Sequence, residues 1–428
     1  MAYSLDNARP LLAVALILLV AWLLSEEKRR FPLKLTIGAL AVQAGLVLAL
    51  FAIPNSQALL AGINAAVDGL ASATDEGTKF VFGYLGGGDQ PFAALPDDAP
   101  PPFIFGFRVL PLILVISALS ALLWHWKILK WITRGFGFLF EKTMGLGGAS
   151  ALAVAANIFM GMVESPIVIR AYLDKLTRAE LFLMMVVGLA TVAGSTMVAY
   201  AIILQPVLPN AAGHVLVASI ISAPAGVLLA RIMIPEQQGE GAGYDYSSDL
   251  KYENATDAIA QGVSSGVMVA VNVASFLIVF VALVWIVNNL LGLFPPLITG
   301  EKPTLQLLFG YLFAPVAWLI GAPWSEAVAA GKILGTKLFL TEFIAFIDLG
   351  AIPVDAMSER TRMILTYAIC GFANIASIGI MTGGMTALMP ERRPEILSLA
   401  WKSLAPGFMA TLMTAAIVAS LPAGLFAK

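Results

Sequence analysis

Residues 188–195 read GLATVAGS, and residues 371–378 read GFANIASI. The two stretches share Gly, Ala and Ala at the same spacing, with a polar residue, Thr191 or Asn374, in the fourth place. Small residues permit the close approach of two backbones, and the carbonyl groups of an unwound turn can coordinate a cation. Each stretch is therefore predicted to be a helix that breaks within a membrane.

An apolar segment with an acidic residue inside it precedes each copy. Glu164 lies 24 residues before the first copy, and Glu342 lies 29 residues before the second. Residues 145–172 around Glu164 also contain several glycines and a proline, and residues 331–348 around Glu342 resemble them. Such interrupted backbone is tolerated at membrane depth only where protein or a water-filled cavity covers it. Both segments are predicted to be re-entrant hairpins.

The composition is that of a membrane protein. Only 12% of the 428 residues are charged and 59% are hydrophobic, and the mean hydropathy is +0.87. A soluble globular protein has about 25% charged residues. This composition excludes a disordered chain, and the balance of 25 basic against 27 acidic residues argues against a nucleic-acid binder. We predict an all-α polytopic membrane protein.

Hydropathy predicts eight spans. They are residues 11–25, 33–51, 104–123, 181–204, 215–232, 263–291, 362–388 and 401–426. Two polar segments interrupt the series. Residues 54–102 are predicted to form an amphipathic helix on the outer face followed by a Pro-rich loop, and residues 235–257 a long loop between two halves.

Basic clusters predict the orientation of these spans. They fall at residues 28–30, 127–142 and 392–393, all on one side, which the positive-inside rule assigns to the cytoplasm. In the second cluster they alternate with aromatic residues, which is typical of an interfacial helix. Both termini then lie outside, and the chain enters the two copies from opposite sides. An inverted repeat of this kind is typical of secondary transporters, which bind substrate and ions near the bilayer midplane.

Polar residues within these apolar segments are candidates for a binding site. A carboxylate at the bilayer centre costs on the order of 3 kcal/mol or more, so Glu164 and Glu342 indicate a pathway or a pairing. The structural alternatives are an ion pair of Glu342 with Lys337 and hydrogen bonds of Glu164 that hold the hairpin tip. The oxygens of Asn157 and Thr191 suit a weakly held hard cation such as sodium. Their alternative role is an inter-helix hydrogen bond, worth about 0.6 kcal/mol on average.

Three motifs resemble those of the concentrative nucleoside transporter family. The family signature G-x-K-x-x-x-N-E-F-V-A appears as GTKLFLTEFIA at residues 335–345, and a second family stretch appears as CGFANIASI at residues 370–378. NIFMGMVESP at residues 157–166 is similar to the family's N-I-F-x-G-Q-T-E-A-P. The motifs occur in the family's order, and the resemblance covers nearly the whole chain.

The resemblance implies a homotrimer that imports nucleosides with sodium by an elevator-type movement. Each protomer would have eight membrane helices and two oppositely oriented re-entrant hairpins. The scaffold would comprise mainly residues 1–124 together with the loop and helix in 233–302. The transport domain would comprise two repeats, residues 125–232 and 303–428, each with an interfacial helix, a hairpin and two helices.

The resemblance also implies roles for individual residues in the two repeats. The residues implied to hold the ribose are Glu342, Phe372, Asn374 and Ser377. The residues implied to face the base are Met162, Val163, Glu164 and Thr196. The residues implied to bind sodium are Asn157 and Thr191 through their side chains, and Met160 and Val192 through their backbone.

Some positions depart from the family pattern. Met162 and Val163 stand where many members have Gln and Thr, which hydrogen-bond the base. A site without such partners discriminates less strictly or differently, so we expect a ribose-bearing solute but no particular base. Thr341 replaces the signature Asn and could weaken contacts next to Glu342. The apolar pair also motivates an alternative, a proton-coupled transporter of the same fold for a modified nucleoside or sugar-like solute.

Other classes of function fit the residues less well. An intramembrane enzyme needs a nucleophile–base pair or metal ligands, but the chain has one cysteine, Cys370, two distant histidines, His125 and His214, and no HExxH motif. A passive channel would be unable to accumulate solute. We expect no enzyme and no organic cofactor, and we expect a location in a bacterial inner membrane.

Overall fold

The computed structural model describes residues 5–51, 56–91, 104–236, 250–296, 300 and 302–422. All regular structure in these ranges is helical, which confirms the predicted all-α architecture. Three parts of the predictions lie outside the described ranges. They are the Pro-rich end of segment 54–102, most of the loop at 235–257 and the end of the last predicted span.

The helices differ widely in length. The longest, α12, has 37 residues, whereas α8 in the first predicted hairpin has five. In chain order they are α1 (Leu5–Leu23), α2 (Leu33–Phe51), α3 (Ser56–Phe82), η1 (Gly83–Gly86), α4 (Phe105–Arg108), α5 (Leu110–His125), α6 (Ile128–Met144), α7 (Gly148–Asn157), α8 (Glu164–Val168), η2 (Arg170–Lys175), α9 (Arg178–Ala190), α10 (Gly194–Leu204), α11 (Ala211–Met233), α12 (Ala255–Leu291), α13 (Leu305–Leu319), α14 (Trp324–Phe339), α15 (Glu342–Ala351), η3 (Val354–Ala356), α16 (Glu359–Ile369), α17 (Ile375–Leu388), η4 (Pro390–Arg392) and α18 (Arg393–Ala419).

Five helical segments of the described chain are long and apolar enough to cross a membrane. They are Phe105–His125, Arg178–Leu204, Ala211–Met233, Ala255–Leu291 and Pro390–Ala419. α13 and α14 pass the same test together, but they bend by 117° at the break between them. α1, α2 and α17 fall in three other predicted spans and are shorter apolar helices. A polytopic membrane protein is thus confirmed, whereas the count of eight spans stays a prediction.

Both copies of the repeat contain a helix break. α9 ends at Ala190 and α10 begins at Gly194, while α16 ends at Ile369 and α17 begins at Ile375. The polar residue in the fourth place is extended in both copies, with φ −110° and ψ 174° at Thr191. Both predicted breaks are therefore present, and the fourth position of the repeat lies within the break in each copy.

Each predicted hairpin is a pair of helices joined by a short turn. α7 and α8 form the first pair, and α14 and α15 form the second. Glu164 and Glu342 are each the first residue of the second helix. The two glutamates therefore occupy equivalent positions, directly after the turn. Re-entry of these hairpins into the membrane stays a prediction.

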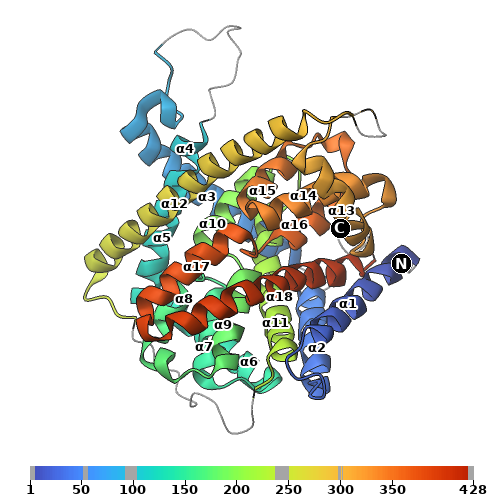
Figure 1. The fold of residues 1–428 in the computed structure, drawn as a ribbon. Coiled ribbons are helices and arrows are strands. Elements are labelled where there is room, and N and C mark those ends of the chain that lie inside the picture. The colour runs from blue at the N-terminus through green and yellow to red at the C-terminus, as the bar shows by residue number, and fades with distance from the viewer. Residues whose placement is uncertain are drawn as a thin grey trace.

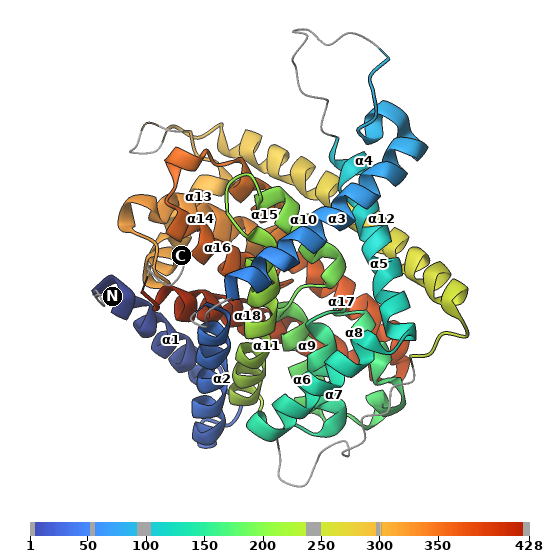
Figure 2. The ribbon, with the colours of Figure 1, turned by 180° about the vertical axis from the view of Figure 1, so that it is seen from behind.

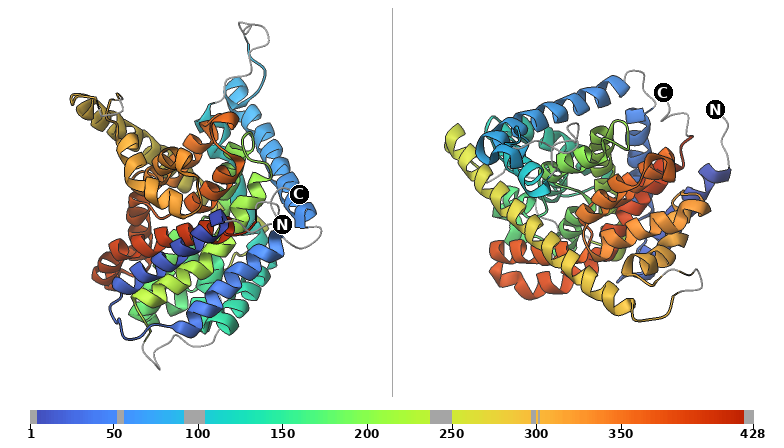
Figure 3. Two further views of the ribbon diagram at one scale, coloured as in Figure 1. Left: turned by 90° about the vertical axis from the view of Figure 1, so that its right-hand side faces the viewer. Right: turned by 90° about the horizontal axis from the view of Figure 1, so that it is seen from above.

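α12 runs along the edge of the molecule and packs mainly against α5 (Figures 1 and 3). Small residues allow this approach, because a Cβ at Gly262 would lie 2.6 Å from the Cα of Ala118, and a Cβ at Gly266 would lie 2.8 Å from the Cα of Leu114. Small residues four apart are typical of close helix contacts in membranes. The buried core lies on the other side, where α9, α11, α16 and α18 pack together.

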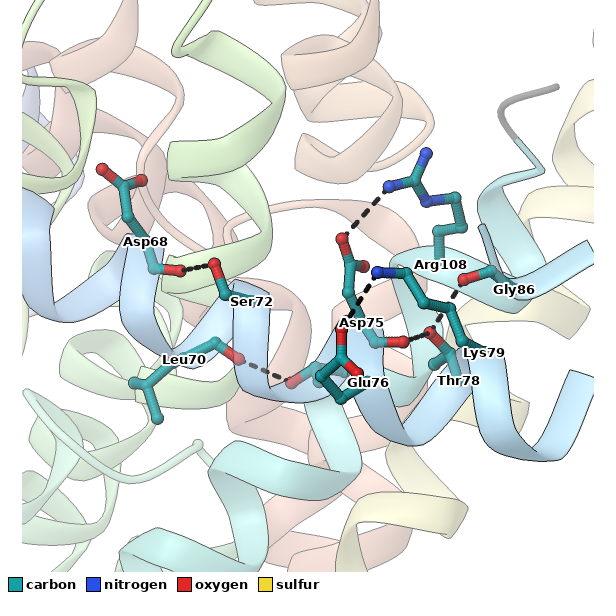
Figure 4. A network of polar contacts seen from close by, with 10 residues as sticks. Asp68, Leu70, Ser72, Asp75, Glu76, Thr78, Lys79, Gly86 and Arg108 are labelled. Atoms are coloured by element: carbon teal, nitrogen blue, oxygen red, sulfur yellow. Dashed lines mark hydrogen bonds and ion pairs between the residues drawn. The ribbon is translucent and has the colours of Figure 1, made fainter. Parts of the chain in front are cut away.

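The first half of the polar segment 54–102 is a helix, as predicted. α3 crosses the face of the molecule seen in Figure 2. Figure 4 shows its polar side, where Arg108 of α4 forms an ion pair with Asp75 at 3.2 Å and the Thr78 hydroxyl donates to the Gly86 carbonyl at 3.0 Å. At the other end, Gln205 donates to Asp68 at 3.1 Å. α3 thereby connects α4 with the end of α10.

Candidate functional site

Glu342 is the centre of a buried hydrogen-bond chain. The Tyr200 hydroxyl donates to its Oε1 at 2.7 Å, and the Asn374 side-chain amide donates to its Oε2. The Asn374 Oδ1 in turn accepts from the backbone N–H of Ser377 at 2.7 Å and caps α17. The structure thus brings together three of the four residues expected to hold the ribose. The fourth, Phe372, is buried in the break before Asn374.

Tyr200 belongs to this cluster, and the sequence reasoning missed it. It lies on α10, and its ring stacks on Phe346 with 4.2 Å between centroids and meets Phe343 edge-on at 5.2 Å. A buried tyrosine hydroxyl usually needs a hydrogen-bond partner, and this requirement in an apolar span was the available signal. Thr196 lies one helical turn earlier, but its hydroxyl bonds the Ala193 carbonyl of its own helix at 3.0 Å.

A small cavity adjoins the Glu342 cluster. Its volume is about 50 Å³, and it is lined by residues of α12, by the start of α15 with Glu342, and by α17 with Ser377. Binding sites for small molecules have volumes of about 300–1,000 Å³. A nucleoside-sized ligand would therefore require α12 and the Glu342 cluster to move apart.

Lys337 is fully buried but does not pair with Glu342. Its ammonium donates to the Ala368 carbonyl at 2.9 Å and to the Thr411 hydroxyl at 2.5 Å, and it lies 4.9 Å from the centre of the Phe408 ring. A cation at the C-terminal end of a helix is favoured by the helix dipole. Lys337 therefore stabilises the end of α16 at the second break, and the alternative of an ion pair with Glu342 is absent from the described residues.

The other signature residues position the turn before Glu342. Gly335 lets α14 approach α13, because a Cβ there would lie 2.3 Å from the Cβ of Phe309. Thr341 caps α15 by accepting a hydrogen bond from the Ile344 N–H at 3.2 Å. Threonine is among the preferred N-cap residues, so the departure from the family's Asn keeps this local function.

Asn157 and Thr191 form a second buried cluster. The Thr191 hydroxyl donates to the backbone carbonyls of Asn157 at 3.0 Å and of Val187 at 2.9 Å. The Ser165 hydroxyl donates to Asn157 Oδ1 at 2.7 Å. The Asn157 Nδ2 is buried without a partner, which costs about 1–3 kcal/mol and needs an explanation in a native structure. Several neutral oxygens thus converge where sodium was expected.

The backbone positions expected to contact sodium lie beside this cluster. The Val192 N–H donates to the Ser219 hydroxyl at 3.3 Å, and the Phe159 carbonyl accepts from the Gly194 N–H at 3.0 Å. Met160 follows Phe159, and its own N–H bonds the Ala156 carbonyl at 2.8 Å. The described residues contain no group of three or more His, Cys, Asp or Glu side chains that could hold a metal ion. A cation here would be bound by neutral oxygens.

The residues of the first hairpin that are expected to face the base are packed against both repeats. Met162 contacts α9 at Gly188, where an added Cβ would lie 2.9 Å from the Met162 Cβ. Val163 contacts α17 at Gly384, where an added Cβ would lie 2.7 Å from the Val163 Cγ1. Glu164 folds back, and backbone groups of the turn hydrogen-bond its carboxylate. The predicted structural role, in which hydrogen bonds of Glu164 hold the hairpin tip, agrees with these contacts.

The nucleoside transport that the family resemblance implies should fall in a Gly161→Ala variant, and the fold should stay intact. A Cβ at Gly161 would lie 2.2 Å from the Glu164 Oε2, so the carboxylate must swing away from the turn. The end of a flexible side chain can yield, and the fold should therefore persist. Uptake should fall about tenfold, which corresponds to about 1.4 kcal/mol. The measurements are uptake of labelled nucleoside and the unfolding midpoint, with Gly45→Ala as control because open space surrounds that position. A parallel loss of stability would contradict this explanation.

The two helix breaks contact each other directly. The Phe372 N–H donates to the Thr191 carbonyl at 3.2 Å. A Cβ at Gly371 would lie 2.8 Å from the Ala190 carbonyl oxygen and 2.6 Å from the Thr411 Cγ2. Only glycine permits this approach of the two backbones. The contact places the oxygen cluster of the first repeat next to the Glu342 cluster of the second.

Comparisons with known proteins agree with these observations. Family models described as "Na+ dependent nucleoside transporter" match residues 12–85 (N-terminus) and 214–419 (C-terminus), and a model described as "Nucleoside recognition" matches residues 106–207. The uncharacterized transporter YutK of Bacillus subtilis is 37% identical, and the alignment covers 97% of this chain and 98% of YutK. The nucleoside permease NupC of Helicobacter pylori is 34% identical, with 96% of each chain covered.

A solved structure is similar over nearly the whole chain. CNTnw in an inward-facing, substrate-bound state has a TM-score of 0.85 and 32% sequence identity, and the match covers 96% of this chain and 98% of CNTnw. The breaks, the paired hairpins and the long edge helix described above therefore belong to a fold that is already known in a substrate-bound form.

Proposed function

This chain belongs to the concentrative, Na+ dependent nucleoside transporter family, and we propose that it imports nucleosides by symport with sodium. It is an integral membrane transporter rather than an enzyme, as its relatives are. The observation that carries the proposal is the contact between the two helix breaks. It joins a buried carboxylate suited to hydroxyl groups with a cluster of neutral oxygens suited to a weakly held cation.

The carboxylate of Glu342 is suited to a hydroxyl of a ribose. An ionised carboxylate offers about four lone-pair sites. Tyr200 and Asn374 occupy two of them, one on each oxygen. The backbone N–H of Glu342 itself also bonds the carboxylate, so about one site remains for a hydroxyl donor. Hydrogen bonds to an ionised acceptor are stronger than neutral ones. Asn374 and Ser377 orient this group from the start of α17 and would bind the sugar with it.

Sodium would be held by Asn157 and Thr191, with the backbone of Met160 and Val192 beside them. These residues connect the turn of the first hairpin with the first break. A cation bound there would order the hairpin, and the ordered hairpin would complete the base side of the site through Met162, Val163 and Glu164. Coupling in this sense is a difference in substrate affinity between the sodium-bound and sodium-free states.

We further propose an elevator-type movement of the two repeats against a scaffold that includes α5 and α12. Residues 1–124 stay predicted to be mainly scaffold, and within them α1 contacts the second repeat. The Asn7 side chain donates to the Leu421 carbonyl at 2.6 Å, and Arg9 donates to the Ala322 carbonyl at 2.9 Å. α2 likewise packs on α11 and α18. These contacts would have to break or shift if the two repeats move against α1 and α2.

The exposed face of α12 supports the proposed homotrimer. An open apolar groove of about 690 Å³ lies along its second half, lined by residues such as Ile278, Val281 and Trp285. Large exposed apolar surfaces on a helix suit contact with lipid or with another subunit. We propose that α12 and α5 form the subunit contact, with the protein in a bacterial inner membrane and both termini outside.

The proposed function predicts sodium-dependent accumulation of nucleosides. Labelled uridine and adenosine are offered to proteoliposomes with and without an inward sodium gradient, and protein-free liposomes serve as the control. We expect accumulation above the external concentration only with the gradient. Uptake driven by a proton gradient without sodium would instead support the proton-coupled alternative. No accumulation of either nucleoside by folded protein would refute the proposal.

A further inference from the structure

α6 presents an unusual stripe of side chains away from the protein. Trp131, Arg134, Phe138 and Lys142 follow each other at intervals of three, four and four residues, and a helix places such residues on one face. Lys127 comes directly before the helix, in a left-handed backbone conformation, and adds a fifth side chain at its N-terminal end. All five are exposed. The opposite face of α6, which includes Leu129, Thr133, Phe140 and Met144, is buried against the rest of the protein. The exposed face of α6 is therefore alternately basic and aromatic rather than simply polar.

The aromatic members of the stripe form the wall of a groove. Trp131 is 80% exposed and Phe138 is 57% exposed. An open groove of about 670 Å³ lies along this part of the helix, lined by Trp131, Ile132, Arg134, Gly135, Phe136, Phe138 and Leu139. All these residues belong to α6, so no other described element closes the groove. Its walls are largely apolar, which suits a hydrocarbon chain.

Positive charge is concentrated at the N-terminal end of the groove. Lys130 is half-buried there, and burial together with the positive charges of Arg134, Lys127 and Lys251 lowers its pKa. Lys251 comes from a distant segment, which is held in place because the Trp124 indole N–H donates to the Leu250 carbonyl at 3.1 Å. Two separate segments of the chain thus bring lysine and arginine side chains to one end of an apolar groove.

We propose that this stripe binds an anionic phospholipid, with the headgroup phosphate at Lys127, Lys130 and Arg134 and an acyl chain along the groove between Trp131 and Phe138. Basic residues near a membrane surface attract anionic lipid, and aromatic side chains are enriched at the headgroup level. An acidic soluble protein would neutralise the charges but would have no need of the groove. A second copy of this surface would bring like charges together.

The proposed lipid site connects to the first hairpin. Phe136 lines the groove on its inner side, and its ring lies 5.7 Å from that of Phe159. Phe159 is in the turn of the hairpin, and its carbonyl holds the start of α10. α6 and α7 also lie side by side at the lower edge of the molecule in Figures 1 and 2. A lipid in the groove would therefore stabilise the position of the hairpin turn.

The test is native mass spectrometry of the purified full-length protein titrated with phosphatidylglycerol or with phosphatidylcholine. We expect retention of phosphatidylglycerol and little of phosphatidylcholine. A Lys127→Gln, Lys130→Gln, Arg134→Gln triple variant should bind phosphatidylglycerol at least tenfold more weakly, and so should a Trp131→Ala, Phe138→Ala variant. The matched control is Lys28→Gln, Arg29→Gln, Arg30→Gln, which removes the same charge from the exposed cluster at residues 28–30, predicted to face the same side, and should bind normally.

Several outcomes would overturn the proposal. Equal retention of the two lipids would show that the net negative charge of the headgroup has no role. An equal loss of binding in the control variant would show that only the net charge of the protein matters. Full competition by glycerol phosphate would indicate a site for a free phosphate group rather than for a lipid. A changed oligomeric state in the stripe variants would make the stripe a subunit contact. An unfolding midpoint measured for each variant ensures that only folded protein is compared, and none of these readouts depends on transport.

Discussion

Uptake of labelled uridine into proteoliposomes is expected to fall at least a hundredfold when Glu342 is replaced by glutamine. The carboxylate accepts hydrogen bonds from Tyr200 and Asn374, both of which are donors. A glutamine side chain has one donor and one acceptor end, so its NH₂ group must face one of these donors. It also loses the charge, and hydrogen bonds to a charged group contribute about 1.5–3 kcal/mol each. Loss of the charged bond to the ribose, together with the disturbed bonds to Tyr200 and Asn374, accounts for the expected decrease.

The controls for Glu342→Gln separate substrate binding from folding. Glu359→Gln makes the same chemical change at an exposed position at the start of α16 and should transport normally. Tyr200→Phe removes one donor and leaves the charge, and it should lower uptake by less, about tenfold or below. If Glu342→Gln keeps more than half of the wild-type uptake, the carboxylate does not contact the transported solute.

Gly371→Ala is expected to lower both stability and uptake. The added Cβ would lie 2.8 Å from the Ala190 carbonyl oxygen and 2.6 Å from the Thr411 Cγ2. The first of these is a backbone atom, so the two breaks must separate. Overpacking of a tight interior costs about 1–3 kcal/mol. The shift would also weaken the hydrogen bond from the Phe372 N–H to the Thr191 carbonyl, which connects the two halves of the site.

The measurement pairs an unfolding midpoint in detergent with sodium-driven uptake. Uptake by Gly371→Ala should fall about tenfold or more, on the scale of the free energy above. Gly379→Ala is the matched control, because it lies on α17 with open space around it. Normal stability together with normal uptake of Gly371→Ala would show that the two breaks do not touch in the working protein. Gly161→Ala should disturb the fold less than Gly371→Ala, because at Gly161 only the flexible Glu164 carboxylate has to move.

The sequence by itself determined the features that depend on local pattern. The spacing of Gly, Ala and a polar residue located both helix breaks, because small residues and a polar side chain act on the backbone immediately around them. The Thr191 hydroxyl bonds the Val187 carbonyl at the end of α9, and the Asn374 side chain caps α17. The low charge content determined the membrane class, since burial in lipid depends on composition more than on contacts. The glutamates at 164 and 342 were recognisable because a carboxylate in an apolar segment is costly wherever the chain folds.

Only the tertiary structure decided which distant groups meet. Tyr200 donates a hydrogen bond to Glu342, which is 142 residues away in the sequence. Lys337 donates to the Ala368 carbonyl and the Thr411 hydroxyl and not to Glu342, although Glu342 is nearby in the sequence. Neither choice follows from periodicity, since the partners are set by how α10, α15, α16 and α18 pack. Such contacts depend on the positions of whole helices to within a fraction of an ångström. A local pattern shows only that a buried hydroxyl or ammonium needs a partner, not which partner it has.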